Sequence, residues 1–597
     1  MISKPQELAD AQNQFFIEKI NLLRQGLPPP VTDPLQTIRL LMQERSCNFS
    51  LSCVHPDEVE QVISSLSNSG SFGMDMIDTF TVKLIRADIL PALTHIINLS
   101  ITSRTFPHSW KKAKVIPLHK TGDVLNPKNY RPVAILPVFS KVLERVIFNQ
   151  MVGYISENNL LHPSHHAYRS HHNTTTALLQ MYDIWLDSLE KAEMARICFL
   201  DMSAAFDIVD HSLLIKKLEL YGFDSSMVKW VSSYLTGRSQ CVSIDGSLSR
   251  CLEVRHGVPQ GSILGPLLYT LFTNELPEVV HADCPEVPGD TWPNFRISCR
   301  KCGSVGCYAD DTTYSCSGAD IAQLSDQLSV KYNTLSNFLT SNRLKLNDDK
   351  THLMVMSTSQ ARAVRKDTIK DSRLVVIRTP TKVIQPSESE KLLGCWLHED
   401  MKFAEHIVNS KESLLCSINQ RIGALKLIAK VANFKTRKMI ANGIFMSKLI
   451  YLIELWGGSS KYLMKALQKA QNRAARFVTK LDWNTTTGEL LRQCGWLSVQ
   501  QLAVYHSVVM VYKVILNKSP KHLYSMFSST YSYKTRQAHN EMLRHTRKPH
   551  LDITKHRWRA AMHYNQLPLG VKSAASVEQF KKKAKSWIRL NISLYPE

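Results

Sequence analysis

Three aspartates in two segments of this sequence could do chemistry together. The segment ICFLDMSAAFD places Asp201 at the end of an apolar β-like run, and VGCYADDTTY places Asp310 and Asp311 at a predicted hairpin tip. Adjacent carboxylates repel one another, so a fold retains them only when something offsets the repulsion. A pair of divalent ions about 4 Å apart, which clamps attacking and leaving oxygens, does so. Mg²⁺ suits such a site, and the alternative for the Asp-Asp pair alone is a solvated turn.

A glycine-rich loop between these two segments suits a nucleotide. In HGVPQGSILGPLLYTLF, the residues Gly257, Pro259, Gln260, Gly261 and Gly265 precede an apolar helix. Glycines let the backbone approach a ligand closely, and the amide of Gln260 can contact that ligand.

Three cations complete the ordered set. Lys120 and Arg131 lie upstream in KVIPLHKTGDVLNPKNYRPVAIL, and Lys350 lies downstream in RLKLNDDKTHLMVMS. Cations of this kind suit a triphosphate. For Lys350 the alternative is an ordinary surface lysine.

The elements that must position these residues are short strands alternating with helices. Between about residues 108 and 400, the runs KAKVIPL, ARICFLD, QCVSIDG and HLMVMS are typical of strands, whereas FSKVLERVIFNQMVGYI is typical of a helix. This alternation predicts an α/β or α+β region. A helix is expected from Glu7 to Leu23. After residue 400 the periodicity is helical and basic, and it ends in the amphipathic FKKKAKSWIRL.

The ordered set resembles the reverse transcriptase of non-LTR (LINE-like) retrotransposons. The matching blocks, in chain order, are SGSFGMD, IPLHKTGD with NYRP, FLDMSAAFDIVDH, GVPQGSILGPLLY, YADD, LKLNDDKT and KLLGCWL. The resemblance implies an α+β, right-hand polymerase with fingers, palm and helical thumb, followed by a basic, mostly helical C-terminal region. The implied domains are an N-terminal helical extension (1–69), fingers and palm (70–400), thumb (401–480) and the C-terminal region (481–597).

The resemblance also implies roles at individual positions. Asp201 and Asp310 fall on the carboxylates that hold two Mg²⁺ ions, with Asp311 supporting them and the Met202 carbonyl as a further ligand. Lys350 falls on a lysine proposed to protonate pyrophosphate.

Other implied roles concern the incoming deoxynucleotide. Lys120 and Arg131 would grip its triphosphate, and Gln260 and Gly261 would pack beside the nucleotide and the template base. Phe206 falls on an aromatic gate whose ring would clash with a ribose 2′-OH and so select deoxynucleotides.

The charge distribution predicts a nucleic-acid partner. Residues 401–597 hold 33 Lys and Arg against 9 Asp and Glu, whereas residues 1–400 are nearly neutral. Within the basic part, QKAQNRAARFVTK presents one basic helix face, and Lys448 lies in an otherwise apolar stripe. Among the five histidines of HPSHHAYRSHHN, a metal site is disfavoured, and Arg169 with Thr174–Thr176 is predicted to contact the template strand. The predicted nucleic-acid contacts are Arg169, Lys448, Lys469, Arg473, Arg476 and Lys480.

Two Cys/His pairs have the spacing of a zinc site. His281-x2-Cys284 and Cys299-x2-Cys302 precede the YADD turn and could form a structural Zn²⁺ knuckle; the alternative is a loop with incidental thiols. Because MISKPQELAD lacks the pattern of a signal peptide, the 13 cysteines are expected to be reduced thiols or metal ligands.

The sequence therefore favours an RNA-directed DNA polymerase acting on an RNA template, a DNA primer and dNTPs. The second hypothesis is an inactive or repurposed nucleic-acid-binding remnant, and an intron-maturase relative fits less well. About 70 residues precede the first polymerase block, too few for the endonuclease that such elements carry. We expect an intracellular protein, nuclear or cytoplasmic, without a membrane span.

Overall fold

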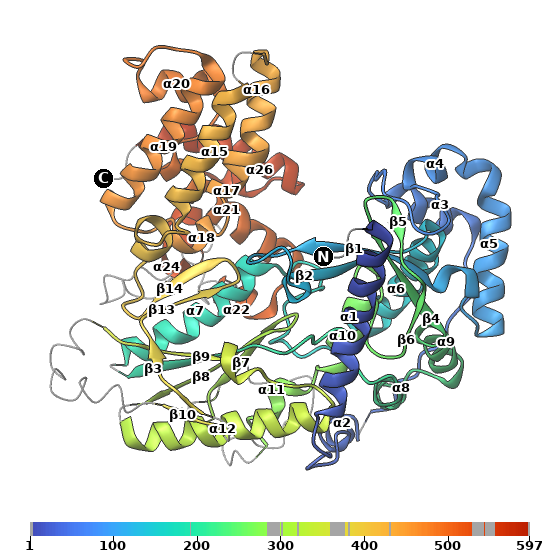
Figure 1. Ribbon diagram of the computed structural model, residues 1–597. Helices are drawn as coiled ribbons and strands as arrows, with labels where there is room; N and C mark the ends of the chain where they lie inside the picture. Colours follow the sequence, from blue (N-terminus) through green and yellow to red (C-terminus); the bar gives the residue numbers. More distant parts are fainter. Residues whose placement is uncertain are drawn as a thin grey trace. The chain divides into compact units, whose positions relative to one another are not determined.

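The described residues mix helices with small β-sheets. The structure is a computed structural model that describes residues 4–282 (apart from 44 and 192), 299, 302–318, 321–358, 376–379, 382–428, 431–527, 543 and 556–594. This mixture confirms the α+β class (Figure 1). The chain divides into two compact units, with Met1–Tyr168, Leu200–Thr312 and Val330–Thr351 in the first and the remaining residues in the second.

The first unit is built on a five-stranded sheet of order β2-β1-β4-β5, in which β6 also pairs with β4. Strand β1 (Lys112–His119) is antiparallel to β2 (Tyr130–Ile135) and parallel to β4 (Arg238–Ile244). The short β5 (Ser247–Leu248) and β6 (Leu252–Val254) fold back on β4. This sheet places the β1–β2 hairpin, which carries Lys120 and Arg131, at one edge.

The rest of the first unit is mostly helical. The apolar faces of its helices supply buried side chains such as Val142 and Ile147 of α6 and Trp230 of α9. These helices are α1 (Pro5–Gln25), α2 (Gln36–Met42), α3 (Pro56–Ser65), α4 (Thr79–Leu84), α5 (Arg86–Ser103), α6 (Val138–Glu157), α8 (His211–Leu220), α9 (Ser225–Leu235), α10 (Gly265–Phe272) and α11 (Leu276–Val279).

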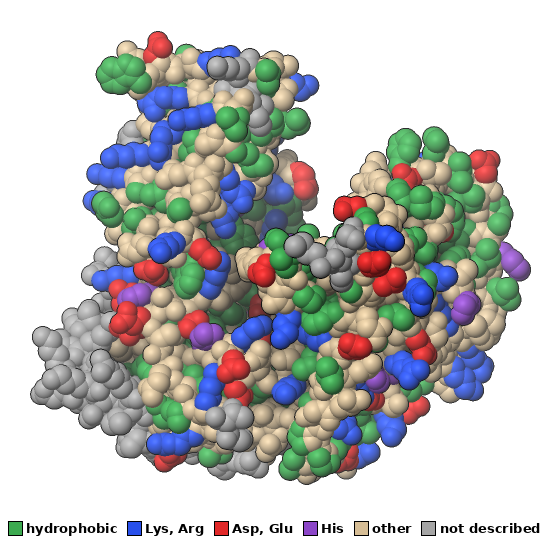
Figure 2. All heavy atoms as spheres, viewed as in Figure 1, with side chains coloured by type: hydrophobic (Ala, Val, Ile, Leu, Met, Phe, Trp, Pro, Cys, Tyr) green, Lys and Arg blue, Asp and Glu red, His purple; other side chains and the backbone are tan. Residues whose placement is uncertain are grey.

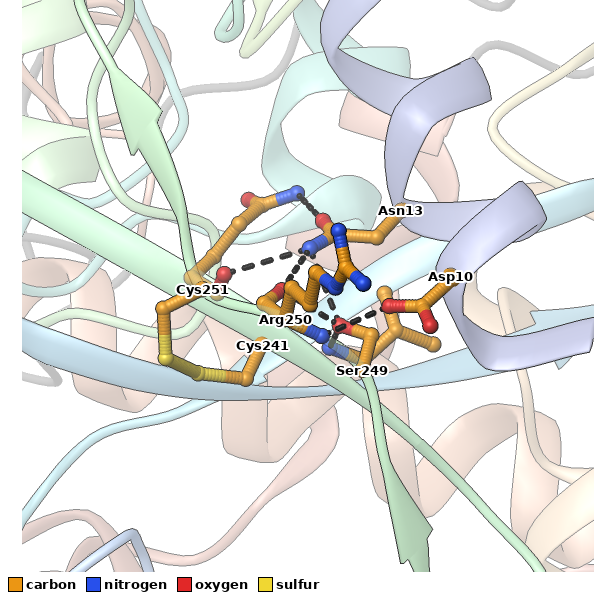
Figure 3. The surroundings of a disulfide bond; sticks show 8 residues. Asp10, Asn13, Cys241, Ser249, Arg250 and Cys251 are labelled. Carbon is orange, nitrogen blue, oxygen red and sulfur yellow. Dashed lines mark hydrogen bonds between the residues drawn. A yellow bond between two sulfur atoms is a disulfide. The ribbon is translucent and has the colours of Figure 1, made fainter. Parts of the chain in front are cut away.

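Helix α1 lies against β4 and is fastened there by polar contacts (Figures 1 and 3). The buried Asn13 donates to the carbonyl of Arg250 at 2.8 Å and accepts from the amide of Gln240 at 2.9 Å. The carboxylate of Asp10 accepts from the backbone N–H of Arg250 at 2.7 Å. The predicted helix at Glu7–Leu23 is thus confirmed and is slightly longer than expected.

A disulfide bond joins Cys241 to Cys251 beside this helix (Figure 3). The expectation that all cysteines are reduced thiols or metal ligands is wrong for this pair. The reason is the hairpin register, because pairing of Gln240 with Leu252 brings the adjacent cysteines together with their Cα atoms 4.5 Å apart. The sequence spacing alone did not reveal this pairing.

The second sheet has the order β12-β9-β3-β8-β7. Its central strand β3 (Met194–Leu200) is buried at every position, as expected for its apolar run, and pairs antiparallel with β9 (His352–Met356). Strands β7 (Ser304–Tyr308) and β8 (Asp311–Gly318) are joined by a two-residue turn, which confirms the predicted hairpin. The edge strand is β12 (Pro386–Ser387).

The second unit is otherwise mostly helical, as the basic periodic sequence after residue 400 predicts. Two small ribbons pair β10 (Ile377–Arg378) with β11 (Val383–Ile384) and β13 (Ser389–Leu392) with β14 (Cys395–His398). Its helices are α7 (Thr174–Glu190), α15 (Leu414–Ile428), α16 (Phe434–Ala441), α17 (Ser447–Leu449), α18 (Ile453–Trp456), α19 (Lys461–Thr479), α20 (Thr487–Cys494), α21 (Val499–Asn517), α22 (Lys521–Phe527), α24 (His556–Gln566), α25 (Leu569–Lys572) and α26 (Val577–Asn591). Helix α12 (Ile321–Ser341) contributes residues to both units.

Helix α21 has the length and apolar character of a membrane span. No other helix among the described residues has both the length and the apolar character to span a membrane. Of the apolar window of α21, 67% is buried inside the structure. Tyr512 of this helix stacks on Phe580 of α26 with ring centroids 4.0 Å apart. The helix is thus packed as the core helix of the C-terminal bundle.

A fully buried ion pair lies in the core of the first unit. The ammonium of Lys217 is 2.6 Å from the carboxylate of Glu275, and both side chains are 0% exposed. The same ammonium donates to the carbonyl of Phe272 at 2.6 Å. The pair therefore ties α8 to the segment between α10 and α11.

Removing one partner of this pair should destabilise the first unit. Lys217→Met leaves the Glu275 carboxylate buried without its cation, which is expected to cost about 3–5 kcal/mol. The double variant K217M/E275L removes both charges and should recover most of that loss. Urea unfolding of the three proteins measures this, and a K217M midpoint equal to that of the wild type would contradict the prediction.

Candidate active site

The three predicted aspartates come together within the first unit. Asp201 follows directly after β3, Asp310 lies in the β7–β8 turn, where Ala309 adopts a left-handed φ of 57°, and Asp311 is the first residue of β8. Burial of its carboxyl, then the negative charges of Asp310 and Asp201, raise the pKa of Asp311 to about 6. The second and third of these causes show that the three carboxylates lie close enough to influence one another.

Backbone hydrogen bonds hold the segment just before Lys350 against the segment of Asp201. The N–H of Asn347 donates to the carbonyl of Asp201 at 2.8 Å, and the N–H of Ser203 donates to the carbonyl of Lys345 at 2.9 Å. Between them, Met202 forms an isolated bridge with Leu346. This arrangement places the Lys350 ammonium 3.7 Å from the Asp201 carboxylate, as an exposed ion pair. Lys350 therefore lies at the site, not on an unrelated surface.

Lys120 and Arg131 lie on the β1–β2 hairpin among other cations. The pKa of Lys120 is lowered first by burial and then by the charges of Arg131, Lys19 and Lys350. Lys19 belongs to α1, and the sequence pattern gave no sign that it would join this group. These cations form a positive region that Asp201 also influences.

The glycines of the nucleotide-like loop are required by close backbone contacts. Gly261 has a φ of 97°, and a Cβ there would lie 2.4 Å from the carbonyl oxygen of Ala134 in β2. Gly257 has a φ of 78°, and a Cβ there would lie 2.5 Å from the carbonyl oxygen of Asp207. Any side chain would push the loop away from β2 or from the segment after Asp201.

Gln260 is held by an aspartate that the sequence reasoning missed. Its amide donates to Asp207 Oδ1 at 2.7 Å, and its backbone carbonyl accepts from the N–H of Ala134 at 3.2 Å. Burial raises the pKa of Asp207 to about 6, although the Gln260 amide and nearby cations oppose the shift. The available signal was the position of Asp207, immediately after Phe206 in the same motif.

The far end of the loop is anchored by a second missed carboxylate, Glu144 of α6. This side chain is 0% exposed, and its Oε2 accepts from the backbone N–H groups of Ile263 and Leu264 at 2.8 and 3.2 Å. These N–H groups precede α10 and have no partner within that helix. Tyr234 also donates to Glu144 at 3.2 Å.

Phe206 is supported from behind by another aromatic ring. It stacks on Tyr269 of α10, with centroids 4.2 Å apart and planes inclined by 28°. The Tyr269 hydroxyl in turn lies 3.5 Å from the sulfur of Met202. The position of the Phe206 ring is thus fixed by α10.

A cavity of about 370 Å³ opens beside these residues in the first unit. Its wall is formed by α1, both hairpin strands β1 and β2, strand β4 and the Gly257–Gln260 loop, and it includes Lys19, Tyr130, Asp207 and Gln260. Its lining does not include Asp201, Asp310, Lys120 or Phe206, so this cavity adjoins the Gln260 loop on the side of α1 and not on the side of the carboxylate cluster.

The predicted nucleic-acid contacts lie in the second unit. On α19, Lys469 and Arg473 are exposed, whereas Arg476 is half-buried and donates to the carbonyl of Trp483 at 2.8 Å. Lys480 caps the helix and is exposed. Figure 2 shows many Lys and Arg side chains over the helices that follow residue 400. The helix face is thus basic, as predicted, except that Arg476 also has a structural contact.

Lys448 and Arg169 are less accessible than the α19 cations. Burial and the charges of Arg421 and Lys391 lower the pKa of Lys448, and burial lowers the pKa of Arg169 to about 10. Both are half-buried.

The neighbouring histidines contact the protein interior. Nε2 of the buried His162 is 2.9 Å from Glu278 Oε1, and Nε2 of the buried His165 is 3.2 Å from the carbonyl oxygen of Thr273.

Of the predicted zinc ligands, His281, Cys299 and Cys302 are close together and buried. Cys284 lies outside the described residues.

Comparison with known proteins finds similarity over most of the chain. Residues 117–397 match the family described as reverse transcriptase (RNA-dependent DNA polymerase). The chain is 25% identical over 446 residues to the RNA-directed DNA polymerase from mobile element jockey of Drosophila melanogaster, covering 74% of this chain and 46% of that protein. It is 27% identical over 481 residues to the probable RNA-directed DNA polymerase from transposon BS of the same species, covering 79% and 50%. The chain thus spans about half the length of these relatives.

The pKa of Asp207 predicts how pH affects stability. Because the folded value of about 6 exceeds the ordinary value of 3.8, this group's contribution is fully present below about pH 4 and is lost as the pH rises through about 6. Asp207→Asn removes the ionisation and keeps an acceptor for Gln260. It should therefore gain stability over the wild type towards pH 8, by at most about 3 kcal/mol.

Thermal or urea unfolding between pH 4 and 8 measures this difference. Asp245→Asn, at an exposed turn, is the matched control and should follow the wild-type pH dependence. Parallel stability curves for D207N and the wild type would show that Asp207 ionises normally.

Proposed function

We propose that this chain, whose residues 117–397 form a reverse transcriptase domain homologous to those of non-LTR retrotransposons, is an RNA-directed DNA polymerase. One observation carries the proposal. Asp201, Asp310 and Asp311 form a carboxylate cluster beside Lys350, next to the Gln260 loop and the Lys120–Arg131 hairpin. These groups, separated by up to 230 positions in the sequence, supply the charges that nucleotidyl transfer needs.

The carboxylate cluster fits two Mg²⁺ ions. The donors are hard carboxylate oxygens, and cations would relieve both the burial and the mutual repulsion that raise the pKa of Asp311. Asp201 and Asp310 would hold both ions, with Asp311 in support and the Met202 carbonyl as a further ligand. When bound, the ions would activate the primer 3′-OH and stabilise charge on the leaving pyrophosphate.

The protein's own groups orient the nucleotide. Lys120 and Arg131, joined by Lys19, would bind the triphosphate, and the Gln260 amide, held by Asp207, would pack against the sugar and base. The Lys350 ammonium, 3.7 Å from Asp201, would give a proton to the pyrophosphate oxygen as it leaves. Positioning and charge thus supply most of the catalysis.

The remaining assignments follow the same proposal. The fold would be a right hand with fingers, palm and thumb. The basic face of α19 (Lys469, Arg473, Arg476 and Lys480), with Lys448 and Arg169, would track an RNA template and a DNA primer. The protein would act inside the cell, in the nucleus or the cytoplasm.

Primer extension tests the proposal. On a primed heteropolymeric RNA template with dNTPs and Mg²⁺, the wild type should extend the primer, and Asp201→Ala or Asp310→Ala should lower the rate by at least about 1,000-fold. Asp245→Asn is the control for general effects of removing a carboxylate. A folded wild type that binds the primed template without extending it would favour the alternative, a nucleic-acid-binding remnant.

A second prediction concerns the Phe206 ring. Phe206→Val removes the ring while keeping the site apolar, so incorporation of rNTPs should rise at least about tenfold relative to dNTPs, or ~1.4 kcal/mol in selectivity. Phe206→Tyr keeps the ring and should keep the preference for dNTPs. Single-nucleotide incorporation kinetics measure both, and an unchanged ratio in F206V would assign sugar selection to another group.

A further inference from the structure

We propose that His281, Cys299 and Cys302 form a structural zinc site that fixes the start of the strand leading to Asp310 and Asp311. The site is independent of the polymerase chemistry, because its ligands lie outside the carboxylate cluster and outside the nucleotide loop. It requires a soft divalent cation rather than Mg²⁺, since two donors are sulfur and one is imidazole nitrogen.

The geometry of the three donors suits a metal. Their ligand atoms all lie within 4.8 Å of one another. Tetrahedral Zn²⁺, with bonds of about 2.0–2.3 Å, places its ligand atoms about 3.5–3.8 Å apart, so movements of about 1 Å bring these three donors to the spacing of three of its four ligands. The side chains are buried together, with exposed fractions of 7% for His281, 7% for Cys299 and 5% for Cys302.

Backbone hydrogen bonds pair Cys299 with Gly303, the residue after Cys302. The N–H of Cys299 donates to the carbonyl of Gly303 at 2.9 Å, and the N–H of Gly303 donates back to the carbonyl of Cys299 at 2.8 Å. Gly303 has a φ of 83°, a backbone conformation that favours glycine. This pairing keeps the two cysteines near each other, and their sulfurs lie within 4.8 Å of each other and of a ring nitrogen of His281.

The histidine gives an independent indication of a missing ligand. Nδ1 of His281 is buried and, within the part of the chain that the structure describes, has no hydrogen-bond partner. A buried polar nitrogen left without a partner is unfavourable, and coordination to a cation would satisfy it. His281 follows α11, and its backbone N–H donates to the carbonyl of Glu278 at 2.9 Å, so its position is set by that helix.

The location of the site explains what it would do. Strand β7 begins at Ser304, directly after Gly303, and Asp310 lies eight residues beyond Cys302. On β7, Cys307 exchanges backbone hydrogen bonds with Ser164 and His166 at 2.9 and 3.0 Å. A metal at the start of β7 would join this strand to the end of α11 and so limit movement of the hairpin.

Metal content tests the proposal without relying on polymerase activity. The full chain, purified with zinc and dialysed into Mg²⁺ buffer, should retain about one Zn²⁺ per molecule by mass spectrometry of metals. Cys299→Ser, Cys302→Ser and His281→Ala should each lose most of it, whereas His281→Cys supplies another zinc ligand and should keep it. Cys53→Ser, an exposed thiol, and Cys307→Ser, a buried thiol on β7, are matched controls that should retain zinc.

Cobalt substitution tests the site in the wild-type protein alone, so its result does not depend on whether the variants fold. Co²⁺ should give the intense visible bands of a tetrahedral site and a thiolate-to-metal transition in the near ultraviolet, and added Zn²⁺ should abolish both. Wild-type protein without zinc, without these bands, and with a melting temperature unchanged by a chelator would overturn the proposal. Zinc retention in a protein that does not extend primers would leave this site established and reject the polymerase assignment alone.

Discussion

Repulsion among three carboxylates is the constraint around which the first unit is organised. Asp201, Asp310 and Asp311 come from two different segments, and the raised pKa of Asp311 shows that they share one electrostatic field. A fold that brings such groups together loses stability unless cations or rigid packing oppose the repulsion. Lys350, Lys120 and their neighbours supply part of the compensating charge. The rest of the site can be understood as what holds these groups in place despite their repulsion.

Polar and aromatic side chains outside the carboxylate cluster hold the loop and the ring of the site in position. Glu144 holds the backbone before α10, Asp207 holds Gln260, and Tyr269 holds the ring of Phe206. Each of these contacts joins segments at least 53 positions apart in the chain, and the side chains of Glu144 and Tyr269 are buried. Precise placement of the loop therefore depends on residues in α6, in α10 and in the segment after β3.

The chemistry-bearing residues could be predicted from the sequence, but their supporting partners could not. Asp201, Asp310 and Asp311 follow or join apolar β-like runs, and strand ends at a sheet edge bring them together. Glycine at 257 and 261 was likewise readable, since both positions have left-handed backbone conformations. In contrast, Glu144 and Lys19 look like ordinary polar positions on amphipathic helices. Only the three-dimensional packing shows that one is fully buried and that the other joins the cations near Lys120. The Cys241–Cys251 bond was missed because it depends on hairpin register, which cysteine spacing does not encode.

The docking of α1 on β4 has a consequence for synthesis on the ribosome. Asn13 of this helix is hydrogen-bonded to Gln240 and Arg250, which follow Asn13 in the chain by 227 and 237 residues. At about 5–20 residues per second, this helix waits roughly 10–45 seconds before the strand that covers Phe16 has been made. Until then its apolar face, with Ala9 and Phe16, has no core to join. This helix is therefore made long before the strand on which it docks, and its apolar face stays exposed in the nascent chain during that interval.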